Sequence, residues 1–225
     1  MLFLTTVDRA VHNAQLPTVE FQMDSNVNMQ LVSAVFSQQM CQKLGAVVID
    51  KENSTIMQGA AIGFDVGRLF GLSGLPDGAY FNAHFATTLG PMIFMPKAIR
   101  NGDPLAYMSL LTHELEHVAQ WKAEKIGMPW LYLTEPSMRA SYEAQAFGGQ
   151  LDLEYWFTGR LPTDLTHQLN SLASSYHLRP EDVKQAEAFM LSHLDTIKAG
   201  GHVSRSSLEA IVWLERNYPQ LKGSF

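Results

Sequence analysis

Apolar residues recur every three or four positions over long stretches of this chain, which is the spacing of one face of an α-helix. Near the start of the chain the pattern predicts a helix from Asn28 to Leu44, ended by Gly45. In the second half the same pattern dominates. It predicts further helices from Pro104 to the residue before Gly127 and over residues 137–157, 163–176, 180–198 and 206–217.

Capping and helix-breaking residues set the expected ends of these helices. Asp103 is a capping carboxylate followed by proline, and Gly127 with Pro129 is a stop signal, so residues 127–136 are expected to form a turn. The pair Gly148–Gly149 is expected to interrupt or weaken the helix that contains it.

Three short β-prone runs lie between the predicted helices. Residues 46–50 predict a buried strand, and residues 55–58 are expected to pair with it across a turn at residues 52–54. Residues 91–96 form an apolar run with a proline at each end. Two interpretations stay open for this run: an edge strand to which a substrate chain could add, or a short core strand.

The order of the elements predicts an α+β fold with a small N-terminal sheet and a mostly helical second half. The 225 residues fit one main domain over residues 1–178 and a C-terminal helical hairpin over residues 179–225 packed on it. Such a hairpin is most often structural cover, but it could present a surface to an assembly partner. The residues expected to face one another in it are Phe189, Leu191, Leu194 and Ile197 with Leu208, Ile211, Val212 and Leu214.

The helix after Asp103 contains the spacing His-Glu-x-x-His, as His113, Glu114 and His117. Histidines four residues apart lie one above the other on a helix, so both imidazoles can reach one metal ion. Glu114 is offset to hold a water beside the metal rather than the metal itself. The competing interpretation is a buried helix whose two histidines are hydrogen-bonded in a core.

Composition excludes several classes of protein. The net charge is −6 and basic residues do not cluster, so no nucleic-acid partner is expected. Cys41 is the only cysteine, which rules out an internal disulfide and leaves His, Asp or Glu as metal ligands. No segment approaches the ~20 apolar residues of a membrane span, and the start of the chain does not read as a signal peptide. A cytoplasmic protein is therefore expected, with release as part of a virion or another particle left open.

With His113, Glu114 and His117 in this spacing, the chain resembles the zincin metallopeptidases. In the zincins whose third ligand is a histidine, the motif continues with Gly and His, but those places hold Gln120 and Ala123 here. The resemblance is therefore to the branch whose third zinc ligand is a glutamate on a later helix, and it implies a zincin-like fold.

Glu143 is the best candidate for that third ligand, because it follows His117 at a distance that lets the chain turn and return antiparallel. Glu135, Asp152 and Glu154 are its rivals. Tyr142 and Phe147 stand where larger members of the family carry an asparagine and an acidic residue. The groups that orient the ligands are therefore expected to differ from those of the family.

The resemblance implies a zinc-dependent hydrolase acting on a peptide or protein substrate. In it His113, His117 and Glu143 would hold Zn²⁺, and Glu114 would be the general base. The alternative is a structural or interaction component of a larger particle, for example a virion, that retains the fold with a structural metal. The residues available to stabilise a transition state, none of them ranked above the others, are Tyr142, Tyr155, Arg139, His84 and His167.

Overall fold

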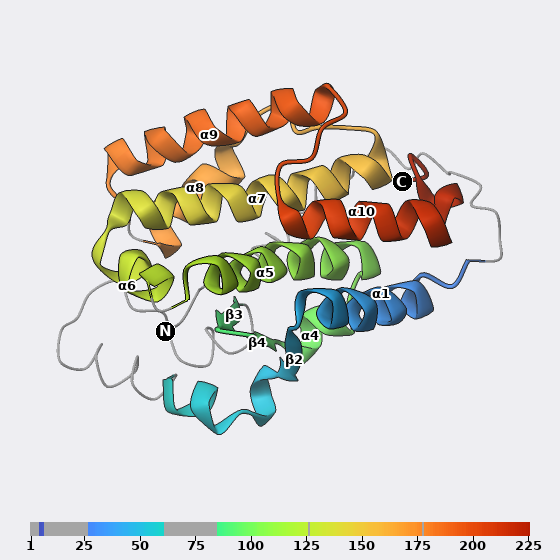
Figure 1. The fold of residues 1–225 in the computed structure, drawn as a ribbon, viewed down its shortest axis with the longest axis horizontal. Helices are drawn as coiled ribbons and strands as arrows, with labels where there is room; N and C mark the ends of the chain where they lie inside the picture. Colours follow the sequence, from blue (N-terminus) through green and yellow to red (C-terminus); the bar gives the residue numbers. More distant parts are fainter. Residues whose placement is uncertain (1–4, 7–26, 61–84, 126, 177) are drawn as a thin grey trace, which may run out of the picture.

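The computed structural model describes residues 5–6, 27–60, 85–125, 127–176 and 178–225 (Figure 1). In this part of the chain the protein is a mostly helical α+β structure with one small sheet. The strands are β1 (Thr5–Thr6), β2 (Val47–Asp50), β3 (Phe85–Leu89) and β4 (Met92–Met95). The helices are α1 (Met29–Leu44), α4 (Lys97–Arg100), α5 (Pro104–Glu124), α6 (Gly127–Thr134), α7 (Pro136–Thr158), α8 (Thr166–Ser175), α9 (Pro180–Lys198) and α10 (Arg205–Asn217), with 3₁₀ turns η1 (Lys51–Asn53) and η2 (Pro219–Leu221).

The sheet has the strand order β1-β3-β4-β2. Strands β3 and β4 form an antiparallel hairpin that turns at Gly90, whose φ of 60° favours glycine. Strand β2 runs parallel to β4, and β1 pairs antiparallel with the start of β3. Strand β4 is thus an inner strand, so the expectation of an edge strand at residues 91–96 is wrong and the core-strand interpretation is correct.

Two other strand expectations need correction. Strand β2 is present, but it forms an edge of the sheet, and Val47 is 57% exposed rather than buried. Residues 55–60 are helical and do not pair with β2. The Ser54 hydroxyl accepts a hydrogen bond from the Met57 amide at 3.3 Å, which is helix capping by a serine. Of the glycine-rich stretch 59–78, residues 61–78 lie outside the described part of the chain.

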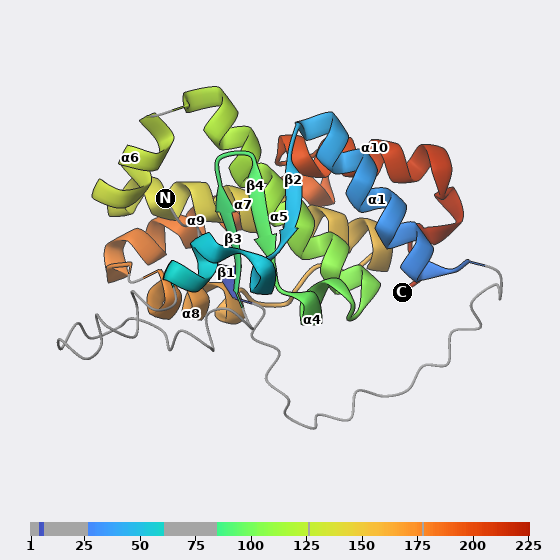
Figure 2. The same ribbon diagram turned by 90° about the horizontal axis from the view of Figure 1, so that it is seen from below.

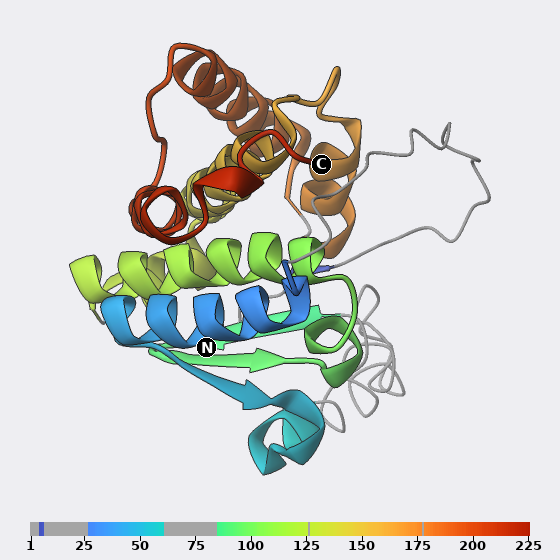
Figure 3. The same cartoon turned by 90° about the vertical axis from the view of Figure 1, so that its right-hand side faces the viewer.

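The helices stack in layers on one side of the sheet. Figure 3 shows α1 and α5 lying against the sheet, α7 and α10 behind them, and α9 outermost, and Figure 1 gives the same order. Figure 2 shows the sheet in front of α5. One apolar core joins α1, the sheet, α5, α10 and the C-terminal part of α7, and a second joins α6, the rest of α7, α8 and α9. Helices α5 and α7 therefore meet where the two cores adjoin.

Helices α9 and α10 do not face each other as a hairpin. Helix α9 packs on α7, whereas α10 packs on α5, α7 and α1. Their buried apolar residues belong to different cores. The expected facing pairs are therefore wrong, and the residues left exposed are Phe189 and Leu191 on α9 and Leu208 and Val212 on α10.

Helix α7 runs unbroken through Gly148 and Gly149, contrary to the expected interruption. Both glycines permit close packing instead. A Cβ on Gly148 would lie 2.4 Å from Nδ1 of His193, and one on Gly149 would lie 2.4 Å from Oγ of Ser204. The packing of α9 and of the segment before α10 against α7 outweighs the low helix propensity of glycine.

We expect Gly148→Ala to destabilise the protein by about 1–3 kcal/mol, although alanine favours helix, because the added methyl overpacks against the His193 ring. Chemical denaturation measures the change. Gly127→Ala is the control, since a Cβ there meets nothing within 4 Å. If the two variants were equally stable, the close packing of α7 against α9 would not require glycine.

Candidate metal centre

Helix α5 presents both histidines of the motif. Its first turn is capped by Asp103, whose Oδ1 accepts from the Ala106 amide at 2.8 Å, as the sequence predicts. The helix ends at Glu124, because Lys125 adopts a φ of 51°, and residues 127–134 form helix α6 rather than the expected turn. Helix α5 is buried along most of its length, and His113 and His117 are 0% exposed.

Glu143 on α7 points between the two imidazoles. Its carboxylate oxygens lie 3.4 Å from Nε2 of His113 and 3.5 Å from Nε2 of His117, and the two Nε2 atoms lie 3.2 Å apart. One ligand atom of each residue lies within 4.8 Å of the others, so the three side chains could hold a metal ion. This is the convergence that the resemblance implies.

The spacing of these atoms fits a tetrahedral ion. With metal–ligand bonds of about 2.0–2.2 Å, neighbouring ligand atoms are separated by roughly 3.3–3.5 Å. Glu143 Oε2 and His113 Nδ1 are buried without a hydrogen-bond partner. A buried carboxylate oxygen without a donor is costly unless a cation satisfies it, and the Nε2 lone pairs face the same point. Three protein ligands leave one corner of the tetrahedron open.

The electrostatics of the cluster favour a cation. Burial lowers the pKa of His113 to about 4, which favours its neutral, ligating form. Burial also opposes charge on His117, but the negative charge of Glu143 outweighs it and raises that pKa to about 9. The pKa of Glu143 falls to about 2, because the two imidazoles overcome the effect of burial. The carboxylate therefore stays ionised, and a metal would compete with a proton for the site.

Two side chains orient the ligands. Nδ1 of His117 donates to Gln120 Oε1 at 2.9 Å, which leaves its Nε2 lone pair for a metal, and Gln120 in turn donates to the Tyr142 carbonyl at 3.0 Å. Tyr132 on α6 donates to Glu143 Oε1 at 2.7 Å. The imidazole of His117 is thus oriented by the neutral amide of Gln120, whereas in many metal sites a carboxylate orients the ligating histidine.

Glu114 lies beside the three ligands and is 0% exposed. Thr88 of β3 donates to its Oε2 at 2.6 Å, and burial raises its pKa to about 7 against the opposing effects of His117 and Thr88. Lys51 is also fully buried, and its ammonium donates to the Phe85 carbonyl at 2.7 Å. Burial lowers the pKa of Lys51 to about 7, although the charge of Glu114 opposes this shift.

One buried tyrosine near the cluster, Tyr176, was not identified from the sequence. Tyr176, which ends α8, is 4% exposed, and its hydroxyl has no hydrogen-bond partner of good geometry among the described residues. Burial first, and then the charges of Glu143 and Glu114, raise its pKa well above the usual range. Both of those carboxylates are therefore close enough to act on it. No local pattern distinguishes Tyr176 in the sequence.

Of the five residues named from the sequence as transition-state candidates, four have other contacts or positions and one is not among the described residues. Tyr142 donates to Glu124, and Arg139 stacks on the Tyr132 ring at 5.7 Å. Tyr155 lines a cavity beside α10, and His167 lines the cavity between α5, α7 and α8. His84 lies outside the described residues.

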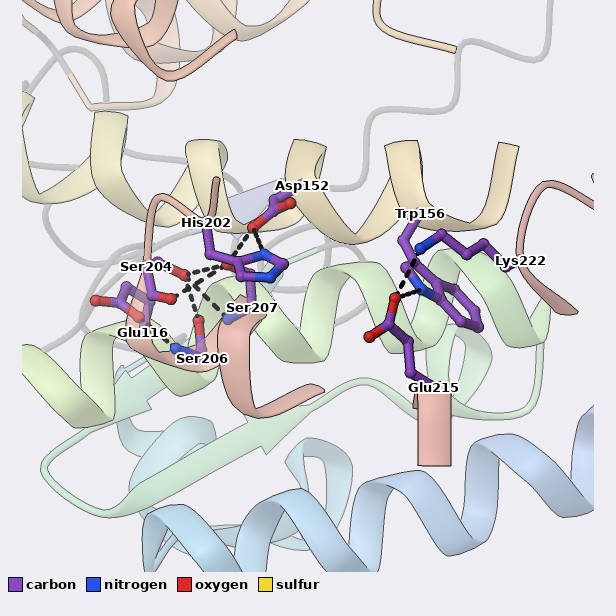
Figure 4. Close-up of polar contacts among 9 residues, drawn as sticks. All are labelled: Glu116, Asp152, Trp156, His202, Ser204, Ser206, Ser207, Glu215 and Lys222. Carbon is purple, nitrogen blue, oxygen red and sulfur yellow. Dashed lines mark hydrogen bonds and ion pairs between the residues drawn. The ribbon is translucent and has the colours of Figure 1, made fainter. Parts of the chain in front are cut away.

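The rivals of Glu143 take other positions. Glu135 is exposed at the start of α7, and Glu154 accepts from Ser109. Asp152 is buried and accepts from Ser207 at 2.7 Å and from His202 at 3.1 Å (Figure 4). None of the three belongs to the cluster around His113 and His117.

Glu116, inside the motif, is buried rather than solvated, and its Oε2 accepts from the Ser206 amide at 2.9 Å (Figure 4). Ser206 lies in the first turn of α10, where a carboxylate is favoured by the helix dipole. Ser207 of the same turn donates to Asp152 of α7. The N-terminus of α10 therefore links the two helices that carry the candidate ligands.

Comparisons of the chain with protein-family models, with curated proteins and with solved structures found no match. Among the described residues, no helix is both long enough and apolar enough to cross a membrane.

We expect Gln120→Leu to weaken zinc binding roughly 10- to 100-fold, because His117 loses the acceptor that sets its tautomer and ring orientation. Competition titration with a chromophoric chelator measures the affinity. Gln42→Leu, at an exposed position of α1, is the matched control. Equal affinity in both variants would show that Gln120 only packs against the site.

Proposed function

We propose that the protein is a zinc-dependent hydrolase and, more specifically, a metallopeptidase. It would be of the zincin type whose third zinc ligand is a glutamate. The observation that carries the proposal is the convergence of three side chains, His113, His117 and Glu143, on one point, with Glu114 held beside them by Thr88. Catalytic zinc sites have three protein ligands and a free position, whereas structural sites usually have four.

In this mechanism each group has one task. Zinc in such a site supplies Lewis acidity and makes water a better nucleophile near neutral pH. Glu114, with its pKa of about 7, accepts the proton of the attacking water and passes it to the leaving amine. The Thr88 hydroxyl donates to Oε2 of Glu114 and so orients the carboxylate.

Tyr176 is the group that we assign to the developing oxyanion. A buried hydroxyl without a partner costs free energy, and a negatively charged oxygen formed at the site would satisfy it. Tyr132 has a different role, since its hydroxyl is already used to hold Glu143. A peptide or protein is the proposed substrate class, by the resemblance of the motif.

A second candidate function is a structural metal site in a component of a larger assembly. The observation that favours it is burial, because His113, Glu114, His117 and Glu143 are all 0% exposed. In that case the metal would clamp α5 to α7. The exposed apolar residues on α9 and α10 would then be candidates for contact with an assembly partner.

We expect Glu114→Gln to lower turnover at least about 100-fold while zinc stays bound, because the base is lost and the ligands are not. Peptide cleavage and metal content are measured on the same preparations. Glu187→Gln on α9 is the control for loss of one carboxylate far from the motif. Parent-like cleavage by Glu114→Gln would show that another group is the base, and bound zinc without cleavage by the parent protein would favour the structural site.

We expect Tyr176→Phe to lower kcat by roughly 10- to 1,000-fold with little change in KM, because an oxyanion donor acts in the transition state and not in substrate binding. Steady-state kinetics on one peptide measures both parameters. Thermal unfolding of the variant is measured in parallel. Unchanged kcat would assign Tyr176 a packing role only.

A further inference from the structure

A cavity of about 580 Å³ opens between helices α5, α7 and α8. Its walls include Ser109 and Leu110 of α5 and Phe147, Leu151 and Glu154 of α7. The lining combines apolar side chains with the charged residues Asp103, Glu154 and Arg160, and two other side chains hold Glu154 in place. A cavity of this size can take a large side chain.

The cavity does not include the candidate metal ligands, but it shares α5 and α7 with them, and Phe147 lies between the two. Ser109 precedes His113 by one helical turn, so the two residues share a face and lie roughly 6 Å apart along the axis. Phe147 follows Glu143 by one turn on α7, and its ring lies edge-on to His113 with centroids 4.7 Å apart. Phe147 thus contacts the metal cluster and also lines the cavity.

Glu154 is held in the cavity wall with one oxygen free. Ser109 Oγ and Gln150 Nε2 both donate to its Oε1, at 2.5 Å and 3.0 Å. Among the described residues no hydrogen bond or ion pair reaches Oε2. Arg160 also lines the cavity and forms no ion pair with Glu154. A carboxylate fixed by two donors but not neutralised is suited to bind a cation.

Resting on the proposed peptidase function, we propose that this cavity receives a lysine or arginine side chain next to the cleaved bond, with Glu154 as its counter-charge. Such side chains have an apolar stem and a charged head. The stem packs on Phe147, Leu110 and Leu151, and the head reaches Glu154, whose hydrogen-bond partner Ser109 precedes His113 by one helical turn. The substrate class is therefore peptides with a basic residue beside the scissile bond.

Binding tests the cavity without requiring catalysis. The zinc-loaded protein is titrated by NMR with Nα-acetyl-lysine amide and with Nα-acetyl-norleucine amide, which has a similar length and no charge. We expect the lysine compound to bind roughly tenfold more tightly, the effect of one charge-assisted hydrogen bond. Glu154→Gln should remove the difference, since the amide keeps an acceptor for Ser109 but has no charge. Glu187→Gln should retain it.

Kinetics then tests the site in the working protein. Matched peptides that differ only in Lys, norleucine or Glu beside the cleaved bond are compared by kcat/KM. The parent should prefer lysine, and Glu154→Lys should shift the preference towards glutamate. Circular dichroism confirms that each variant is folded.

The outcomes separate this inference from the proposed function. Preferential binding of the lysine compound that depends on Glu154, with no cleavage of any peptide, would support the cavity assignment and contradict the peptidase. Cleavage with equal binding and equal kcat/KM for lysine and norleucine would support the peptidase and overturn the assignment. A preference for lysine that survives in Glu154→Gln would also overturn the role of Glu154.

Discussion

The structure depends on one electrostatic constraint: the carboxylate of Glu143 is fully buried between the imidazoles of His113 and His117. A buried carboxylate with an oxygen that lacks a donor is unfavourable, and the same negative charge raises the pKa of His117 to about 9. A cation at the point where the three side chains converge satisfies all of them at once. The position of α7 relative to α5 is therefore set by this cluster as well as by apolar packing.

The surrounding fold holds the two helices at that distance from several sides. Small residues on α7 admit close neighbours, so α9 approaches at Gly148 and Ser204 at Gly149. The N-terminus of α10 bonds to Glu116 of α5 and to Asp152 of α7 (Figure 4). These contacts lie around the ligands and not among them. They give the cluster a rigid frame, which a metal site needs if its ligands are to keep their geometry.

The small sheet matters mainly because it positions side chains beside the metal cluster. Strand β3 holds Glu114 through Thr88, and the buried Lys51 is bonded to the Phe85 carbonyl of the same strand. The sheet thus positions the Glu114 carboxylate, whereas the candidate metal ligands are positioned by helices α5 and α7. Because of this division, Glu114 has a hydrogen-bond partner outside the cluster of candidate ligands.

The sequence by itself determined the features that depend on local spacing. The positions of α1, α5, α7, α9 and α10 follow from apolar periodicity and from signals such as the Asp103 cap, which act within one helical turn. The two histidines share a face of α5 for the same reason. Identifying Glu143 as the third candidate ligand also required the resemblance to a family, because spacing alone did not exclude Glu135, Asp152 or Glu154.

Tertiary structure decided what depends on contacts through space. It placed β4 inside the sheet, formed a helix at residues 127–134, separated α9 from α10, and brought Tyr132 and Tyr176 to the cluster. Burial of apolar faces chooses the neighbours of each element, and a single sequence records which faces are apolar without recording which of them meet.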